Sequence, residues 1–268
     1  VVVVIVLSAM YRPGGILNQY CGRWDGMASE SDEADYVRSD AETVLRVEGV
    51  KKTFGGVTAL DGVDLEVRNE EIVGLVGPNG AGKTTMFNCI MGEHEVDAGS
   101  VHLGETEITD MDTPQIVQTG ISRMFQLARV FPELTVRENV LLNQDHREEN
   151  MLSTLFQDTN EEVIRRAEEL IDFVDLTHLI DEQAGNLSGG QKKLLNLACT
   201  LLTEPDVVLL DEPTAGVNPN LVDDITDSII DLNRERETTF LIIEHDMDVI
   251  SEISDHVYVF ATATNLTD

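Results

Sequence analysis

Uninterrupted apolar runs predict the strands that the chain buries. The segments 72–76, 207–210 and 240–243 contain no charged or hydrogen-bonding side chain. Such runs are typical of strands that are covered on both faces, as in a parallel sheet. The segment 257–260 is mostly apolar as well and predicts a last strand near the end of the chain.

Apolar residues at three- to four-residue spacing predict a helix between the second and third of these runs. Asn218-Pro219 precede it, and proline suits the first helical turn. The apolar stripe consists of Leu221, Ile225, Ile229 and Leu232. Buried strands that alternate with helices favour an α/β fold with a mainly parallel sheet and right-handed crossovers.

The pattern changes twice within the residues 42–268, which we expect to form the folded domain. Residues 44–47 and 63–67 alternate apolar and charged side chains, as half-buried strands do. The middle of the chain, about 127–195, holds no buried run, and an apolar stripe over 161–174 predicts a helix there. This part is therefore predicted to be a helical insertion in the α/β core.

Residues 1–41 show no sustained period and are predicted to be an N-terminal extension without fixed structure. Met27-Ala28-Ser29-Glu30 resembles a native start, so we expect residues 1–26 to be translated upstream sequence. The alternative is a short amphipathic extension whose apolar run docks on the domain.

Charge is the unusual quantity in the composition. The 268 residues include 18 Lys and Arg against 50 Asp and Glu, a net charge of −32, while 42% are hydrophobic. The acidic residues are spread along the chain, and such a surface repels phosphate backbones, which disfavours nucleic acid as a partner. At molar salt the Debye length falls to about 3 Å, so we interpret the charge as an adaptation to a salt-rich cytoplasm, as in haloarchaea. An ordinary acidic protein is the alternative.

Three cysteines, an odd number with no C-x-x-C pair, predict neither a disulfide framework nor a zinc site. Cys89 and Cys199 lie in apolar helical patterns and are expected in the core. The run 1–7 is shorter than the roughly 20 residues that span a bilayer, and it has no basic flank of a signal peptide. We expect a soluble, intracellular chain.

A phosphate-binding loop follows the first buried run. Residues 77–84 fit G-x-x-x-x-G-K-[ST] at every position, between a strand and a helix. Backbone N–H groups and the helix N-terminus would hold phosphates, Lys83 would neutralise them, and the Thr84 hydroxyl would bind Mg²⁺. A plain glycine turn is the alternative. The candidate phosphate-binding residues are Gly77, Pro78, Asn79, Gly80, Ala81, Gly82, Lys83, Thr84 and Thr85.

Two carboxylates end the second buried run. Asp211 is suited to Mg²⁺, and Glu212 to a general base that takes a proton from the attacking water. Open α/β sheets bind ligands at the carboxyl ends of their strands, which places these residues beside the phosphate loop. His245 follows the third run, where it would contact the γ-phosphate. Its neighbours Glu244 and Asp246 would instead suit an ordinary polar loop.

The pentapeptide Leu187-Ser188-Gly189-Gly190-Gln191 resembles the signature motif of ATP-binding cassette ATPases, and the resemblance runs from about 44 to 260. It implies a P-loop NTPase cassette with a small antiparallel β subdomain. It also implies two cassettes in a dimer, in which Ser188, Gly189, Gly190 and Gln191 contact the ATP of the opposite copy. A small-residue helix cap is the alternative for this motif.

The same resemblance assigns further roles residue by residue. Phe54 would stack on adenine, although packing at a strand end is the alternative, and Gln126 would link Mg²⁺ and water to a transmembrane partner. Residues 215–218 match the loop that joins the two active sites, and His245 matches the switch histidine. The catalytic set implied is Glu212, His245, Gln126 and Lys83, with Thr84, Gln126 and Asp211 as the metal site.

Residues 52–60, 84–90 and 243–247 resemble the longer ATPase of branched-chain amino acid importers. That likeness implies transmembrane permease subunits, a second cassette of the same or another kind, an extracytoplasmic solute-binding protein, and a place on the cytoplasmic face of the membrane. Cassettes for urea, other amino acids or lipid export, and soluble non-transport cassettes, are the alternatives. The family normally continues beyond 257–260 through another strand and a helix, so the end at 261–268 looks truncated.

Overall fold

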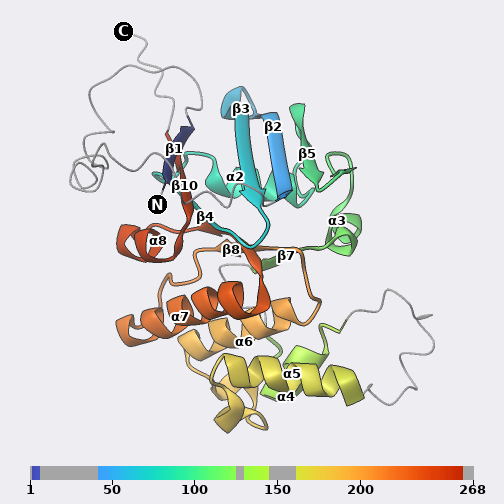
Figure 1. The fold of residues 1–268 in the computed structure, drawn as a ribbon, viewed down its shortest axis with the longest axis vertical. Helices are drawn as coiled ribbons and strands as arrows, with labels where there is room; N and C mark the ends of the chain where they lie inside the picture. Colours follow the sequence, from blue (N-terminus) through green and yellow to red (C-terminus); the bar gives the residue numbers. More distant parts are fainter. Residues whose placement is uncertain (1, 7–41, 125–129, 145–160, 262–268) are drawn as a thin grey trace.

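A six-stranded, wholly parallel sheet forms the centre of the computed structural model, which describes residues 2–6, 42–124, 130–144 and 161–261 (Figure 1). Its order is β1-β10-β4-β9-β8-β7. The strands are β1 (Val2–Val6), β4 (Ile72–Val76), β7 (Ile121–Met124), β8 (Val207–Asp211), β9 (Thr239–Ile243) and β10 (His256–Phe260). The α/β prediction and the four strands predicted from apolar runs are confirmed.

Alternate residues of the central strands enter two separate apolar clusters. In β8, Val208 and Leu210 face one cluster, whereas Val207 and Leu209 face the other. The same alternation occurs in β4 and β9. The runs 72–76 and 240–243 have no polar positions because the side chains on both of their faces are buried away from water. The continuous runs in the sequence thus reflect a sheet that is covered on both sides.

A four-stranded antiparallel sheet covers one face, in the order β3-β2-β5-β6. Its strands are β2 (Thr43–Phe54), β3 (Val57–Arg68), β5 (Ala98–Leu103) and β6 (Thr106–Glu107). Gly55 and Gly56, with φ of 52° and 90°, form the two-residue turn that joins β2 to β3, since both positions of such a turn need positive φ. The helices α2 (Lys83–Ile90) and α3 (Thr113–Thr119) lie on this side (Figure 1).

Helices cover the opposite face of the parallel sheet (Figure 1). They are α4 (Val136–Leu141), α5 (Glu161–Phe173), α6 (Gly189–Leu201), α7 (Pro219–Arg236) and α8 (Met247–Ile253), with short 3₁₀ turns η1 (Thr177–Leu179) and η2 (Ala184–Asn186). The segment predicted as a helical insertion contains α4, α5 and the start of α6. Within the described parts of that segment the only β pairing is the bridge between Thr135 and Gln183.

Residues 2–6, the described part of the extension predicted to lack fixed structure, are extended. Residues 2–6 form β1, which pairs in parallel with β10 from Val2–His256 to Val6–Phe260. This pairing corresponds to the docking alternative for the apolar run and corrects the prediction for these residues. Residues 7–41 and 262–268, with the proposed native start and the ending that looks truncated, lie outside the described residues. No helix in the described part of the chain is long and apolar enough to cross a membrane.

Candidate nucleotide site

The carboxyl ends of three neighbouring parallel strands, β4, β9 and β8, lie side by side. β4 ends at the glycine loop, β8 ends at Asp211 directly before Glu212, and β9 leads to Glu244 and His245. Backbone hydrogen bonds join these ends: the Glu212 N–H donates to Ile243 O at 2.8 Å, and the Glu244 N–H to Leu75 O at 3.4 Å. The predicted convergence of the motifs at one sheet edge is therefore what the structure has.

Glycine is required in the loop 77–82 for two different reasons. A Cβ on Gly77 would lie 2.3 Å from the carbonyl oxygen of Phe260, and one on Gly82 would lie 2.5 Å from that of Ala59. Gly80 faces open space but has a φ of 82°, which side chains rarely adopt. The loop therefore keeps its backbone exposed on one side and packed against β10 and β3 on the other, as a phosphate cradle requires.

Lys83 begins α2 and turns its amine back into the loop. Its Nζ donates to Gly77 O at 2.6 Å and to Pro78 O at 3.1 Å, while the side chain is buried. Burial lowers the pKa of Lys83, and the nearby charges of Glu212 and Asp211 oppose that effect. An anion placed in the cradle would meet a buried ammonium group, and the exposed Thr84 hydroxyl one residue on. These donors fit a nucleotide's phosphates.

Asp211 lies buried against an arginine that the sequence motifs do not include. Arg123, from β7, donates from Nη2 to Asp211 Oδ2 at 2.7 Å and from Nη1 to Asn88 Oδ1 at 2.7 Å. Its guanidinium also lies over the Phe87 ring, 5.5 Å from the centroid. Only 4% of the Arg123 side chain is exposed. The arginine thus ties the carboxylate at the end of β8 to the helix that follows the glycine loop.

Glu212 and His245 are in direct contact. His245 Nε2 lies 2.9 Å from Glu212 Oε1, and Glu212 has a φ of 52°, an uncommon value for a residue with a side chain. Glu244 fixes the backbone around the site: its buried carboxylate accepts from the Thr214 N–H at 2.8 Å, from the Thr214 hydroxyl at 2.6 Å and from the His245 N–H at 3.0 Å. Glu212 and Glu244 therefore have different roles: Glu212 contacts His245 in the site, and Glu244 fixes the loop after β8.

A cleft of about 520 Å³ opens beside these side chains. Besides Glu212 and His245 it is lined by the loop after β8 and by the start of α8, including Thr214, Val217, Asp246 and Val249. In the part of the chain that the structure describes, no three His, Cys, Asp or Glu side chains gather as a metal cage. A magnesium ion here would rely on a hydroxyl, a carboxylate and phosphate oxygens, which is the usual ligand set for that ion.

The signature segment begins helix α6 with a reciprocal cap. The Ser188 hydroxyl accepts from the Gln191 N–H at 3.3 Å, and the Gln191 side chain accepts from the Ser188 N–H at 2.9 Å. Ser188 and Gly189 are exposed, whereas a Cβ on Gly190 would lie 2.5 Å from Leu221 Cδ1. The helix cap that was the alternative for this motif is present, and it leaves Ser188 and Gly189 at the start of α6 exposed.

Phe54 is not packed in the core. It is 42% exposed at the end of β2, with its ring edge-on to His94 at 5.1 Å and the Lys52 amine 5.4 Å from its centroid. Both alternatives for Phe54 therefore stay open: the ring packs on His94 and Lys52 at the strand end, and it is exposed enough for a flat ligand to contact it. Gln126 lies outside the described residues.

Cys89 and Cys199 are buried as predicted, and burial raises their thiol pKa values to about 11 and about 12.

Comparison with known proteins identifies the family. The family model described as "ABC transporter" matches residues 60–215. The chain belongs to the ABC transporter family. It is 38% identical over 224 residues to a probable branched-chain amino acid transport ATP-binding protein, LivG, of Methanocaldococcus jannaschii, covering 82% of this chain and 87% of that protein. It is 38% identical over 231 residues to BraF of Pseudomonas aeruginosa, a high-affinity branched-chain amino acid transport ATP-binding protein, covering 84% and 91%.

Solved structures agree with that assignment. A cassette of an ABC transporter in its ADP conformation superposes with a TM-score of 0.72 at 38% identity, covering 81% of this chain and 87% of that chain. A dimeric bacterial ABC transporter cassette superposes with a TM-score of 0.67 at 26% identity, covering 81% and 94%. The cassette fold, with its parallel and antiparallel sheets, is thus shown, and the chain is an ABC ATPase, of a class that binds ATP or ADP, dimerises and associates with transmembrane permeases.

Proposed function

We propose that this chain is the ATP-hydrolysing subunit of a branched-chain amino acid importer. The names of the relatives LivG and BraF support the cargo, at 38% identity over more than four fifths of the chain. In this proposal the cassette lies on the cytoplasmic face of the membrane, bound to permease subunits that receive the amino acid from an extracytoplasmic solute-binding protein. Cargo recognition belongs to those partners.

The contact between Glu212 and His245 beside the glycine loop carries the proposed chemistry. Glu212 accepts a proton from the attacking water, and His245, 2.9 Å from its carboxylate, contacts the γ-phosphate. Lys83 exchanges its carbonyl partners for the β- and γ-phosphates. Phe54 offers its exposed ring to adenine.

We further propose that Thr84, Gln126 and Asp211 hold Mg²⁺. That ion would neutralise phosphate charge and orient the γ-phosphate. Thr84 is exposed at the start of α2, and Asp211 lies at the adjoining end of β8 with one oxygen fixed by Arg123. These two oxygen donors suit a hard cation.

The exposed Ser188 and Gly189 at the start of α6 support a dimer in which two cassettes face each other across a twofold axis. A helix N-terminus and the Ser188 hydroxyl attract an anion, and in this monomer they face outwards. We propose that Ser188, Gly189, Gly190 and Gln191 bind the γ-phosphate held by the other copy, which makes the dimer a condition for hydrolysis.

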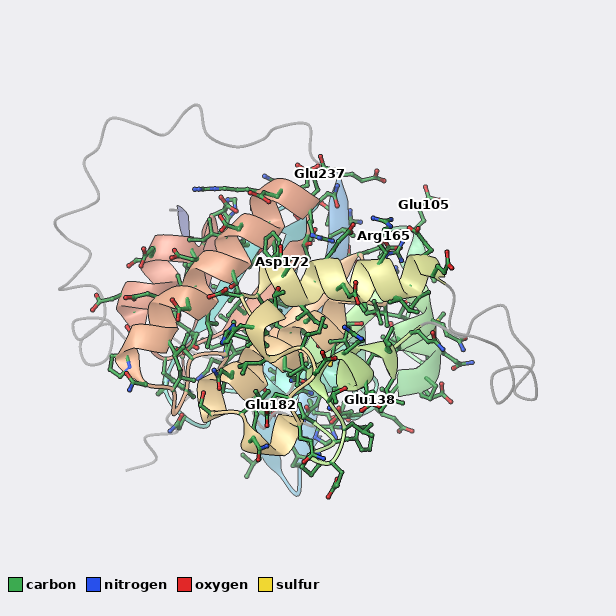
Figure 2. All side chains as sticks on the ribbon, turned by 90° about the horizontal axis from the view of Figure 1, so that it is seen from below. Glu105, Glu138, Arg165, Asp172, Glu182 and Glu237 are labelled. Atoms are coloured by element: carbon green, nitrogen blue, oxygen red, sulfur yellow. The ribbon has the colours of Figure 1, made fainter. Side chains whose placement is uncertain are left out.

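The charge supports a salt-rich cytoplasm. Exposed carboxylates lie on well-separated elements around the molecule, as Figure 2 shows for the labelled Glu105, Glu138, Asp172, Glu182 and Glu237. With a net charge of −32, the folded state repels itself unless salt screens the charges.

Steady-state ATPase assays of Glu212→Gln in molar KCl test the catalytic proposal. We expect activity to fall at least 100-fold while nucleotide binding is retained, because the amide cannot accept the proton. Glu237→Gln, an exposed carboxamide replacement beyond α7, is the matched control. Unchanged hydrolysis in Glu212→Gln would overturn the role of Glu212.

The cargo has its own experiment. The chain is expressed with a tag in a halophilic host, membranes are extracted in high KCl, and the co-purified proteins are reconstituted in vesicles. Uptake of labelled leucine that depends on ATP supports the proposal. Recovery of a permease that moves urea or another solute instead would overturn the branched-chain assignment and leave the ATPase assignment intact.

A further inference from the structure

A lysine of the signature helix holds the backbone of the residue proposed as the base. Lys193 lies in the second turn of α6, and its Nζ donates to Glu212 O at 3.0 Å and to Ala215 O at 2.7 Å. These two carbonyls close the turn after β8, in which the Ala215 N–H also donates to Glu212 O at 3.2 Å. A single charged donor thus bridges both ends of the turn.

That turn needs an external hold. Glu212 has a φ of 52°, in the left-handed region, which costs free energy for a residue with a Cβ and persists only where surrounding contacts impose it. This backbone conformation sets the direction of the Glu212 side chain, which brings its carboxylate to 2.9 Å from His245 Nε2. Relaxation of the backbone to negative φ would swing the carboxylate away from that position.

Lys193 lies in a partly buried site beside two carboxylates. Its side chain is half-buried, and burial lowers the pKa of Lys193 while the charges of Glu244 and Glu212 raise it. Burial of half of a charged amine costs free energy that a fully exposed lysine would not lose. Lysine is also scarce in this chain, with five in 268 residues. The neighbouring Lys192 donates to Gly185 O at 3.2 Å, outside the turn.

We propose that Lys193 is a positioning residue that sets the Glu212 carboxylate for hydrolysis by clamping the carbonyls of Glu212 and Ala215. The clamp lies on the same helix as Ser188, about 7.5 Å along its axis at five residues of 1.5 Å rise. Helix α6 therefore carries the signature turn, which would serve the partner's nucleotide, and also the lysine that holds the backbone of the base, which serves the chain's own nucleotide. This inference rests on the proposed role of Glu212.

The test compares Lys193→Met with Lys192→Met in the full chain, in molar KCl. We expect Lys193→Met to lower kcat for ATP about tenfold, equivalent to roughly 1.4 kcal/mol of transition-state stabilisation, with KM and fluorescent-nucleotide affinity unchanged. Lys193→Arg, which can donate to both carbonyls, restores at least half of the activity. Lys192→Met behaves as the wild type.

Several results would overturn the inference. One is a kcat in Lys193→Met equal to that of Lys192→Met, and another is a parallel loss of nucleotide affinity. If both Lys193→Met and Lys193→Gln melt below the assay temperature, Lys193 stabilises the fold and the positioning role is wrong. Glu212→Gln separates the two proposals: when it abolishes hydrolysis and Lys193→Met does not reduce it, the proposed function stands and the clamp fails.

Discussion

Arg123 provides the sharpest test of how the site is held together, through the substitution Arg123→Met. The side chains of Arg123 and Asp211 are 4% and 10% exposed, and Arg123 Nη2 lies 2.7 Å from Asp211 Oδ2. Methionine keeps much of the packing on Phe87 but leaves the Asp211 carboxylate buried without this cation. Removal of one partner of a buried pair costs about 3–5 kcal/mol.

That cost is large enough to measure. At about 2–4 °C per kcal/mol for a chain of this size, the melting temperature should fall by about 6–20 °C. The assay is thermal and urea unfolding in molar KCl with EDTA, so that no divalent ion replaces the arginine. Arg165→Met is the matched control, because Arg165 pairs with Glu162 and Glu169 on the exposed side of α5 and should change little.

A double variant identifies the cause. Arg123→Met leaves the Asp211 carboxylate charged, buried and without its cation, and Asp211→Asn removes that charge. The loss of unfolding free energy in the double variant Arg123→Met/Asp211→Asn should therefore be about 1–3 kcal/mol smaller than the sum of the two single losses. A loss in Arg123→Met no larger than in Arg165→Met would refute the reasoning. So would a double variant whose losses simply add.

Three further outcomes are expected. Unfolding free energy should rise steeply between dilute buffer and molar KCl, because screening removes the repulsion of a −32 net charge, and full stability in dilute buffer would contradict this. At pH 8, iodoacetamide should spare Cys89 and Cys199 until the protein unfolds, since buried thiols with pKa values of about 11 and about 12 stay protonated; peptide mass spectrometry reads the labelled sites. Gly77→Ala should abolish nucleotide binding in a calorimetric titration, because its Cβ would lie 2.3 Å from the Phe260 carbonyl oxygen. Gly80→Ala should weaken binding less, because its Cβ would meet no atom within 4 Å and only the strain of a φ of 82° opposes it.

Some elements escape sequence reasoning because their environment is not local. The strand β7, Ile121–Met124, reads as a mixed polar segment, yet it lies beside β8 in the parallel sheet. Arg123 is buried there because Asp211, 88 residues away, and Asn88, 35 residues away, accept its hydrogen bonds. No window of sequence contains those partners. The strand β1 belongs to the same class, since only its pairing with β10 distinguishes it from an apolar run in an extension.

The sequence by itself determined what depends on short-range chemistry. Continuous apolar runs located β4, β8 and β9, and period-two alternation located parts of β2 and β3. The spacing of glycines, lysine and threonine located the phosphate loop. The tertiary structure alone decided which polar groups meet: His245 with Glu212, Glu244 with Thr214, and Lys193 with the carbonyls of the turn after β8. The reason is physical. Burial of apolar residues repeats along a strand, whereas a hydrogen bond between distant elements is fixed only when the sheet brings the carboxyl ends of its strands together.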